Sequence, residues 1–296
     1  MKSIRVLVLL TGALLALAVP ALAQAKQSPK PYYLSLGDSL AAGVQPGKDG
    51  VARNTRQGFA YQLARKAGGV RLVNYGCGFA TTGSMIKGNR ACLPARDPGY
   101  RNVSPKTSQL AAAERFLKAR RGKPGFVTID IGANDVASCG AGGQIDLPCV
   151  SKGVAAIGRN APKIAKRLRA AAGKGTPMAV MTLYDPFLAL WFTGSTGKVL
   201  AKASQALAKD QVNAVIVKAF KARGFKVADV AKAFKSYKPF STDGDSTGTP
   251  PVAVAEICRL TWMCAPAPRG PDIHANKAGY GLIATTFQKA LGKAAR

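Results

Sequence analysis

The sequence predicts an α/β protein in which helices cover both faces of a parallel sheet. Short apolar segments, the first three of which stop at glycine, alternate along the chain with longer segments of helical periodicity. This alternation is typical of βαβ units, because parallel strands need a helical connection across the sheet. The 296 residues are 47% hydrophobic, enough for a large core, and show no repeat or long linker. We therefore expect a single domain over residues 26–296.

The expected elements follow in chain order. The strands are expected at residues 31–36, 70–75, 126–131, 178–183 and 225–230, and the first three stop at Gly37, Gly76 and Gly132. The helices are expected at residues 59–66, 107–120, 161–172, 197–222 and 276–291. Thr107 is the expected cap of the second helix. Residues 89–105 and 241–251 are rich in proline or polar turn residues and predict loops, the second at the rim of a site.

The N-terminal segment has the pattern of an export signal. Lys2 and Arg5 precede an apolar stretch that runs to Val19, and small residues at 21–23 or 23–25 offer a cleavage site. The apolar stretch is short for a membrane span. Residues 1–25 are therefore predicted to be a signal peptide, and the mature protein is predicted to be secreted and extracellular.

Six cysteines fit an oxidising compartment, where disulfides persist. Six cysteines allow 15 pairings. Their order along the chain favours the local pairs, which are Cys77–Cys92, Cys139–Cys149 and Cys258–Cys264. The chain has one histidine and no Cys-x-x-Cys pair, which argues against a zinc site.

The charge balance is strongly basic, with 43 Lys and Arg against 14 Asp and Glu and a formal net charge of +29. Such a surface attracts anionic lipid, acidic glycans or nucleic acid. The basic residues are spread along the whole chain and match no nucleic-acid motif, so no specific nucleic acid is expected. Adhesion to an anionic membrane or envelope is the more plausible hypothesis, and we expect a monomer.

Residues suited to nucleophilic catalysis lie where the predicted strands end. Ser39 follows the first strand, Gly78 follows the second and Asn134 follows the third. His274, the only histidine, precedes the last helix with Asp272 two residues earlier. Ligands of open α/β sheets gather at the carboxyl ends of the strands, and a serine nucleophile needs a base such as histidine. These positions predict a hydrolytic site.

The ordered motifs resemble the SGNH/GDSL hydrolase family, in particular its exported bacterial lipases and esterases. The matching segments run over nearly the whole mature chain and are Tyr33-Leu34-Ser35-Leu36-Gly37-Asp38-Ser39-Leu40, Ile131-Gly132-Ala133-Asn134-Asp135, Tyr184-Asp185-Pro186-Phe187 and His274-Ala275-Asn276. The resemblance implies a flavodoxin-like three-layer α/β/α fold with a mainly parallel five-stranded sheet. It also implies hydrolysis of carboxylic esters without a cofactor.

Carried onto this chain, the resemblance implies that Ser39 attacks the ester carbonyl and His274 moves the proton. Asp272 would orient the imidazole, and the oxyanion would accept hydrogen bonds from the Ser39 N–H, the Gly78 N–H and the Asn134 amide. Asp38 is expected to cap the helix after Ser39 and Asp135 to be structural.

Two positions depart from the family pattern. The family spaces its acid and histidine as Asp-x-x-His, whereas here one residue intervenes and Pro271 holds the usual acid position. Either Asp272 or a backbone carbonyl then orients His274. The glycine after Cys77 also stands one position early, so Gly78 or Phe79 could supply the second oxyanion donor.

The leading functional hypothesis is an exported esterase or lipase acting on a small-molecule or lipid ester. A glycan O-deacetylase would use the same site with a different pocket. A basic cell-envelope binding protein with a degenerate hydrolase fold is the alternative from another class. The natural substrate and its acyl chain length do not follow from the sequence.

Overall fold

A computed structural model describes residues 30–88, 104–123, 125–240 and 249–296. Its main sheet has five parallel strands in the order β4-β1-β5-β6-β7, which confirms the five predicted strands. The strands are β1 (Tyr32–Leu36), β4 (Arg71–Asn74), β5 (Gly125–Ile129), β6 (Met178–Met181) and β7 (Lys226–Ala228). All the carboxyl ends therefore meet at one edge, where Ser39 follows β1.

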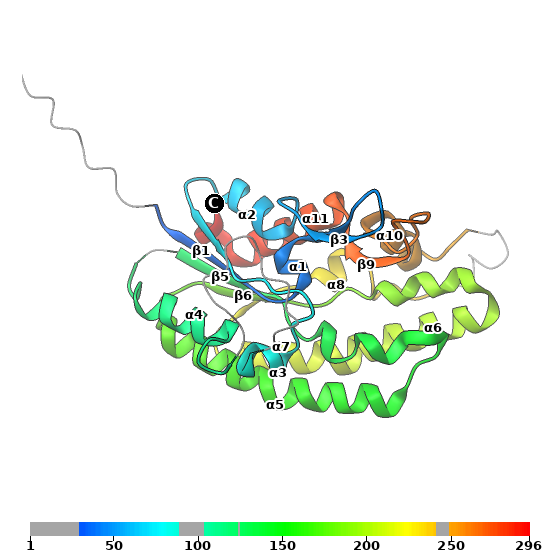
Figure 1. Cartoon of the computed structure of the whole chain (residues 1–296), viewed down its shortest axis with the longest axis horizontal. Helices are drawn as coiled ribbons and strands as arrows, with labels where there is room; N and C mark the ends of the chain where they lie inside the picture. Colours follow the sequence, from blue (N-terminus) through cyan, green and yellow to red (C-terminus); the bar gives the residue numbers. More distant parts are fainter. Residues whose placement is uncertain (1–29, 89–103, 124, 241–248) are drawn as a thin grey trace, which may run out of the picture.

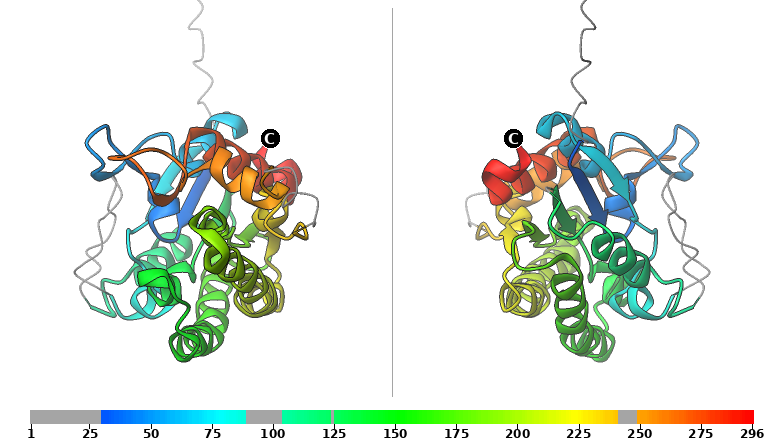
Figure 2. Two further views of the ribbon diagram at one scale, coloured as in Figure 1. Left: turned by 90° about the vertical axis from the view of Figure 1, so that its right-hand side faces the viewer. Right: turned by 90° about the vertical axis from the view of Figure 1, so that its left-hand side faces the viewer.

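Helices cover both faces of the sheet, so the three-layer α/β/α prediction is confirmed (Figures 1 and 2). One layer contains α2 (Phe59–Ala67), α8 (Val230–Ala233), α10 (Val252–Leu260) and α11 (Lys277–Leu291). The other contains α3 (Thr82–Lys87), α4 (Gln109–Lys118), α5 (Leu147–Ala172), α6 (Gly194–Leu207) and α7 (Ala214–Lys221). Because both faces are covered, the central strands β1, β5 and β6 are buried except at the first residues of β1 and β5, which explains their continuous apolar runs.

Several short elements have no counterpart in the sequence prediction. Two small antiparallel sheets are formed by β2 (Val44–Pro46) with β3 (Ala52–Asn54) and by β8 (Thr261–Trp262) with β9 (Asp272–Ala275). The short helical segments are α1 (Ser39–Ala42), η1 (Ala133–Asp135), η2 (Ala137–Gly143), η3 (Pro186–Thr193) and η5 (Gly292–Ala295). Elements of two to eight residues are too short to show a hydrophobic period.

The structure corrects the start of two helices. Helix α4 is capped by Ser108, whose side chain accepts the Ala111 N–H at 3.2 Å, so the Thr107 cap was wrong. Thr107 instead closes the preceding turn by accepting the Ser104 N–H at 3.1 Å. Helix α5 begins at Leu147 and not at residue 161, because Asp146 caps it and Pro162 is tolerated inside it.

The predicted helix over residues 197–222 is one continuous helical run with a π-helical segment, η4 (Ala208–Asn213), between α6 and α7. Most of the predicted loop at 89–105 and residues 241–248 of the second loop lie outside the described residues. The predicted signal peptide also lies outside them.

Two of the predicted disulfides are present, Cys139–Cys149 and Cys258–Cys264, with Cα atoms 5.5 and 5.0 Å apart. Cys92 lies outside the described residues, so the pairing with Cys77 stays a prediction. Within the described ranges, no helix combines the length and hydrophobicity that a membrane crossing requires.

Candidate active site

Ser39 is the first residue of α1, directly after the turn that ends β1. As expected, Asp38 caps this short helix, and its Oδ1 accepts the Leu40 N–H at 2.9 Å. Gly37 has a φ of 141°, and a Cβ there would overlap the carboxyl group of Asp130. Only glycine fits this tight approach, so the turn presents Ser39 in a half-buried position at the carboxyl edge of the sheet.

A buried glutamine fixes the same turn. The Gly37 N–H donates to Gln109 Oε1 at 2.9 Å, and Gln109 Nε2 donates to the Gly37 carbonyl at 2.9 Å. That carbonyl also accepts the Cys77 N–H at 3.1 Å. Sequence analysis missed Gln109. The sequence signal that could have revealed its role is a polar residue beside Leu110 at the start of an amphipathic helix. The inner face of that helix is buried.

Asp272 and His274 lie in β9, where side chains two residues apart point to the same side. Asp272 Oδ1 is 2.8 Å from His274 Nδ1 and also accepts the His274 backbone N–H at 2.8 Å. Partial burial alone would raise the pKa of Asp272, but the interactions with His274 outweigh it and lower that pKa. The extended strand thus explains how Asp-x-His spacing brings the two side chains together.

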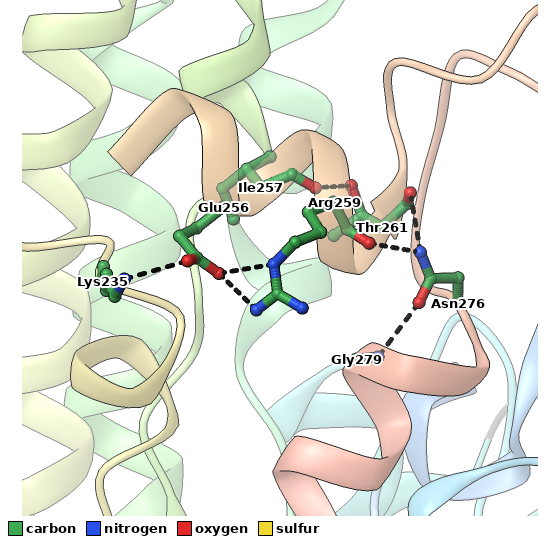
Figure 3. A network of polar contacts seen from close by, with 7 residues as sticks. All are labelled: Lys235, Glu256, Ile257, Arg259, Thr261, Asn276 and Gly279. Atoms are coloured by element: carbon green, nitrogen blue, oxygen red, sulfur yellow. Dashed lines mark hydrogen bonds and ion pairs between the residues drawn. The ribbon is translucent and has the colours of Figure 1, made fainter. Parts of the chain in front are cut away.

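A polar network fixes β9 to the neighbouring elements (Figure 3). Asn276 caps α11 by accepting the Gly279 N–H at 3.0 Å, and its Nδ2 donates to the Arg259 carbonyl at 2.8 Å. Glu256 of α10 binds both Arg259, at 2.6 Å, and Lys235, at 3.0 Å. The strand that carries His274 is therefore tied to the end of α10.

Asn134 lies in η1, just beyond β5. Its Nδ2 donates to the Ala80 carbonyl at 3.0 Å, which joins η1 to the loop after β4. Asp135 accepts the Thr82 N–H at 2.8 Å and the Thr82 hydroxyl at 2.7 Å. Burial raises the pKa of Asp135 even though the Thr82 hydrogen bonds act in the opposite direction. Asp135 anchors η1 to α3, as its expected structural role requires.

Ser39, Asn134 and His274 line one small pocket, of about 40 Å³, together with Tyr184 and Ile273. The pocket brings the predicted residues from three separate segments into one place. Ser39 and His274 have no direct hydrogen bond in it, and such bonds are often long before substrate binds.

Gly78 and Phe79 lie outside the lining of this pocket, in the loop that ends at Ala80. Gly78 is buried, whereas the Phe79 side chain is 64% exposed and its φ is 61°. The loop is joined to Asn134, but the choice between the two N–H groups as oxyanion donor stays a prediction.

An apolar cavity of about 120 Å³ adjoins the small pocket. The two share five wall residues, which are Ala133, Leu183, Tyr184, Pro186 and Ile273. The Tyr184 hydroxyl donates to the Ile273 carbonyl at 2.8 Å and so joins the wall to β9. Asn213, at the end of the π-helical segment, fixes the wall by accepting the Leu183 N–H at 2.7 Å and donating to the Leu183 carbonyl at 2.8 Å. Sequence analysis assigned no role to Tyr184 or Asn213.

The cavity contains one buried carboxyl group, Asp185. Burial raises the pKa of Asp185 to about 6, although the Ser204 hydroxyl at 2.7 Å and the Phe187 N–H at 3.0 Å both bind it. Among the described residues, no cluster of histidine, cysteine, aspartate or glutamate side chains could hold a metal ion.

The model of the GDSL-like lipase/acylhydrolase family matches residues 35–282, so the chain belongs to that family. No curated protein sequence matches the chain.

Among solved structures, phospholipase A1 from Streptomyces albidoflavus is 17% identical with a TM-score of 0.55, and an extracellular lipase from Streptomyces rimosus is 22% identical with a TM-score of 0.54. Both alignments cover 88% of this chain and 99% of the other. An acetylxylan esterase from Geobacillus stearothermophilus is 16% identical, covers 88% and 94%, and has a TM-score of 0.50. At these identities the likeness shows a shared fold.

Proposed function

We propose that this protein is an exported serine hydrolase that cleaves carboxylic esters with apolar acyl groups. The observation that supports this proposal most is the convergence of Ser39, Asn134 and His274 on one pocket that adjoins an apolar cavity. A family of lipases and acylhydrolases uses such chemistry, and the chain belongs to that family.

In the proposed reaction, the Ser39 hydroxyl attacks the ester carbonyl while His274 accepts its proton. The tetrahedral intermediate collapses to an acyl-enzyme, and His274 returns the proton to the leaving alcohol. Water then repeats the sequence and releases the acid. The carboxylate of Asp272, 2.8 Å from Nδ1, holds the imidazole with Nε2 free for this transfer and favours the cation that forms.

The oxyanion needs neutral donors that are already in place before the reaction. Ser39 begins α1, so its backbone N–H is free of the hydrogen bonds inside that helix. One Asn134 Nδ2 hydrogen is held by the Ala80 carbonyl, which leaves the second hydrogen for the substrate. Loss of one such donor costs about 3–4 kcal/mol of transition-state stabilisation. The third donor is Gly78 or Phe79.

The apolar cavity is the proposed acyl site because it adjoins the pocket of Ser39 and is lined mainly by hydrocarbon. Burying apolar surface stabilises a bound chain by about 0.8 kcal/mol for each methylene group. Esters with several carbons in the acyl chain should therefore react faster than acetates, until the cavity is filled.

Turnover of a series of p-nitrophenyl esters by wild type and Ser39→Ala tests the proposal. Ser39→Ala should lose activity towards every ester, whereas Ser151→Ala, on the exposed side of α5, should keep it. Unchanged turnover by Ser39→Ala would sink the assignment of the nucleophile.

A matched pair of substitutions tests the acyl site. Ala208→Leu extends into the cavity wall and should shift the preference towards shorter esters. Ala203→Leu places the same side chain on an exposed position of α6 and should leave the preference unchanged. If both variants keep the wild-type chain-length profile, the cavity does not bind the acyl group.

O-deacetylation of a glycan is the second candidate, because a structure with the same fold is an acetylxylan esterase. It predicts that acetylated polysaccharide outcompetes longer esters and that Ala208→Leu has no effect.

Export is proposed for the same chain, with residues 1–25 as a signal peptide and residues 26–296 as one hydrolase domain. Its support is the N-terminal pattern, the two disulfides and the extracellular lipase of similar fold. N-terminal sequencing of secreted protein tests the cleavage site. The net charge of +29 supports electrostatic adhesion to an anionic surface, which salt should reverse.

A further inference from the structure

Two carboxyl groups, those of Asp38 and Asp130, are buried together beneath the turn that carries Ser39. Their residues are 1% and 0% exposed. The Asp38 N–H lies 3.4 Å from Asp130 Oδ2, and the two side chains are within hydrogen-bonding reach of each other. A Cβ on Gly37 would overlap Asp130 Oδ1, so this carboxyl group packs directly against the turn.

Each carboxyl group of this pair has an oxygen without a donor among the described residues. These atoms are Asp38 Oδ2 and Asp130 Oδ1. A buried carboxylate oxygen without a donor is costly, and two adjacent buried carboxylates repel each other. A proton held between the two groups relieves both problems, because it supplies the missing donor and removes one of the two charges.

Among the described residues, the charged groups that interact with the pair include no cation other than the catalytic base. The titratable groups that interact with it are Asp135, His274, Tyr33, Tyr184 and Tyr280. No lysine or arginine within the described ranges forms an ion pair with either carboxyl group.

We infer that Asp38 and Asp130 share one proton, that the bridged pair fixes the turn of Ser39, and that its remaining negative charge stabilises the cationic form of His274 during the reaction. The last part of this inference rests on the proposed function. Both aspartates are positioning residues, because Asp130 lies outside the lining of the pocket, whereas Asp38 lines it and acts through the turn of Ser39 and the charge of His274.

The direction of the titration agrees with this geometry. Burial, and then the charge of Asp38, raises the pKa of Asp130 well above its ordinary value. Burial raises the pKa of Asp38 as well, while its hydrogen bonds with Asp130 and Leu40 and the charge of His274 act in the opposite direction. Both directions favour a proton held by the pair, and the larger rise is that of Asp130.

Infrared spectroscopy of the whole protein tests the shared proton without any substrate. At neutral pH the wild type should show the C=O stretch of a buried protonated carboxylic acid, and Asp130→Asn should lose that band. A wild-type spectrum without the band would overturn the inference. Because no ester is needed, this test stands even if the proposed function fails.

Two variants of nearly the same shape test the effect of the charge. Asp130→Asn keeps a donor beside an ionised Asp38, whereas the double variant Asp38→Asn/Asp130→Asn keeps the hydrogen bonds but carries no charge. In the double variant, kcat/KM should fall about tenfold below that of the single variant, the equivalent of one pKa unit. The acidic limb of its pH profile should also move to lower pH, because protonation of the base loses a stabilising neighbour.

Identical pH profiles in the two variants would show that the charge has no part in the reaction. Asp130→Val serves as the matched apolar replacement, and it should be far less stable than Asp130→Asn because it leaves Asp38 Oδ2 without a donor. Equal stability of these two variants would contradict the proton bridge.

Discussion

The turn of Ser39 and the strand of His274 face the same pocket, yet the protein holds them in different ways. The serine turn lies at the end of a central strand, and its Gly37 backbone is fixed by the buried Gln109 side chain. The histidine lies in a small sheet outside the main one, where the Asp272 and His274 side chains are 20% and 13% exposed. One half of the site is part of the core, and the other is attached to it.

This difference indicates which changes should affect stability and which should affect the reaction. The groups that fix the serine turn are buried, so few other hydrogen-bond partners can replace them. Their loss should therefore destabilise the whole fold. Hydrogen bonds and a disulfide near the surface hold β9 in place. The loss of one of these interactions should act mainly on the geometry of His274. The predictions below run from the largest expected effect to the smallest.

Asp272→Asn should lower kcat by about 10²–10⁴-fold, because the imidazole loses its orientation and the stabilisation of its cation. The pKa of Asp272 is lowered, so the carboxylate stays ionised at neutral pH and supports the reaction until the pH falls through that low value. Thermal unfolding should change little. Asp49→Asn, in an exposed ion pair, is the control for a lost carboxylate. Full activity of Asp272→Asn would instead favour a backbone carbonyl as the orienting group.

Gln109→Leu should lower the free energy of unfolding by about 3 kcal/mol, because the Gly37 N–H loses its partner in a buried site. Denaturant titration measures this loss, and the exposed Gln144→Leu is the control. A loss below about 1 kcal/mol would mean that the core does not depend on this clamp.

Replacing Cys258 and Cys264 together by serine should cost about 2 kcal/mol, the loop entropy expected for a closed loop of this length. The effect should be local. Hydrogen exchange should speed up in β8 and β9 while the amides of β1 and β5 stay protected. Uniformly faster exchange would show that the histidine side is not a separate unit.

Asn276→Ala should cost about 1 kcal/mol through the lost cap of α11. Asn276→Asp can still accept the Gly279 N–H but cannot donate to the Arg259 carbonyl. The aspartate variant should therefore be more stable than the alanine variant, whereas the kcat/KM of both variants should lie below that of the wild type. If the aspartate variant regained both the stability and the kcat/KM of the wild type, the hydrogen bond from Asn276 to the Arg259 carbonyl of α10 would not be needed to position His274.

Much of the fold was predictable because its strands are buried on both faces and its helices are long. Short apolar runs, the first three of which stop at glycine, predicted all five strands, and the strand-end rule placed Ser39 and Asn134 at the same edge. The start of α5 was not predictable from periodicity, because Pro162 inside the helix has the pattern of a helix start.

The polar partners within the site could not be predicted in the same way. Gln109 meets Gly37 across 72 residues, and Asn213 meets Leu183 across 30 residues. Their short-range pattern is that of ordinary helix residues, and only tertiary packing gives them their role. The Asp-x-His spacing is the reverse case, since it departs from the family pattern and becomes understandable once residues 272–275 are a strand.

The most direct test of the central claim is mass spectrometry of the protein after treatment with an organophosphonate ester probe. The account predicts one covalent adduct, on Ser39, that forms at a much lower rate in His274→Ala because the hydroxyl then lacks its base. An adduct on another residue, or ester turnover by a protein that never labels at Ser39, would contradict it.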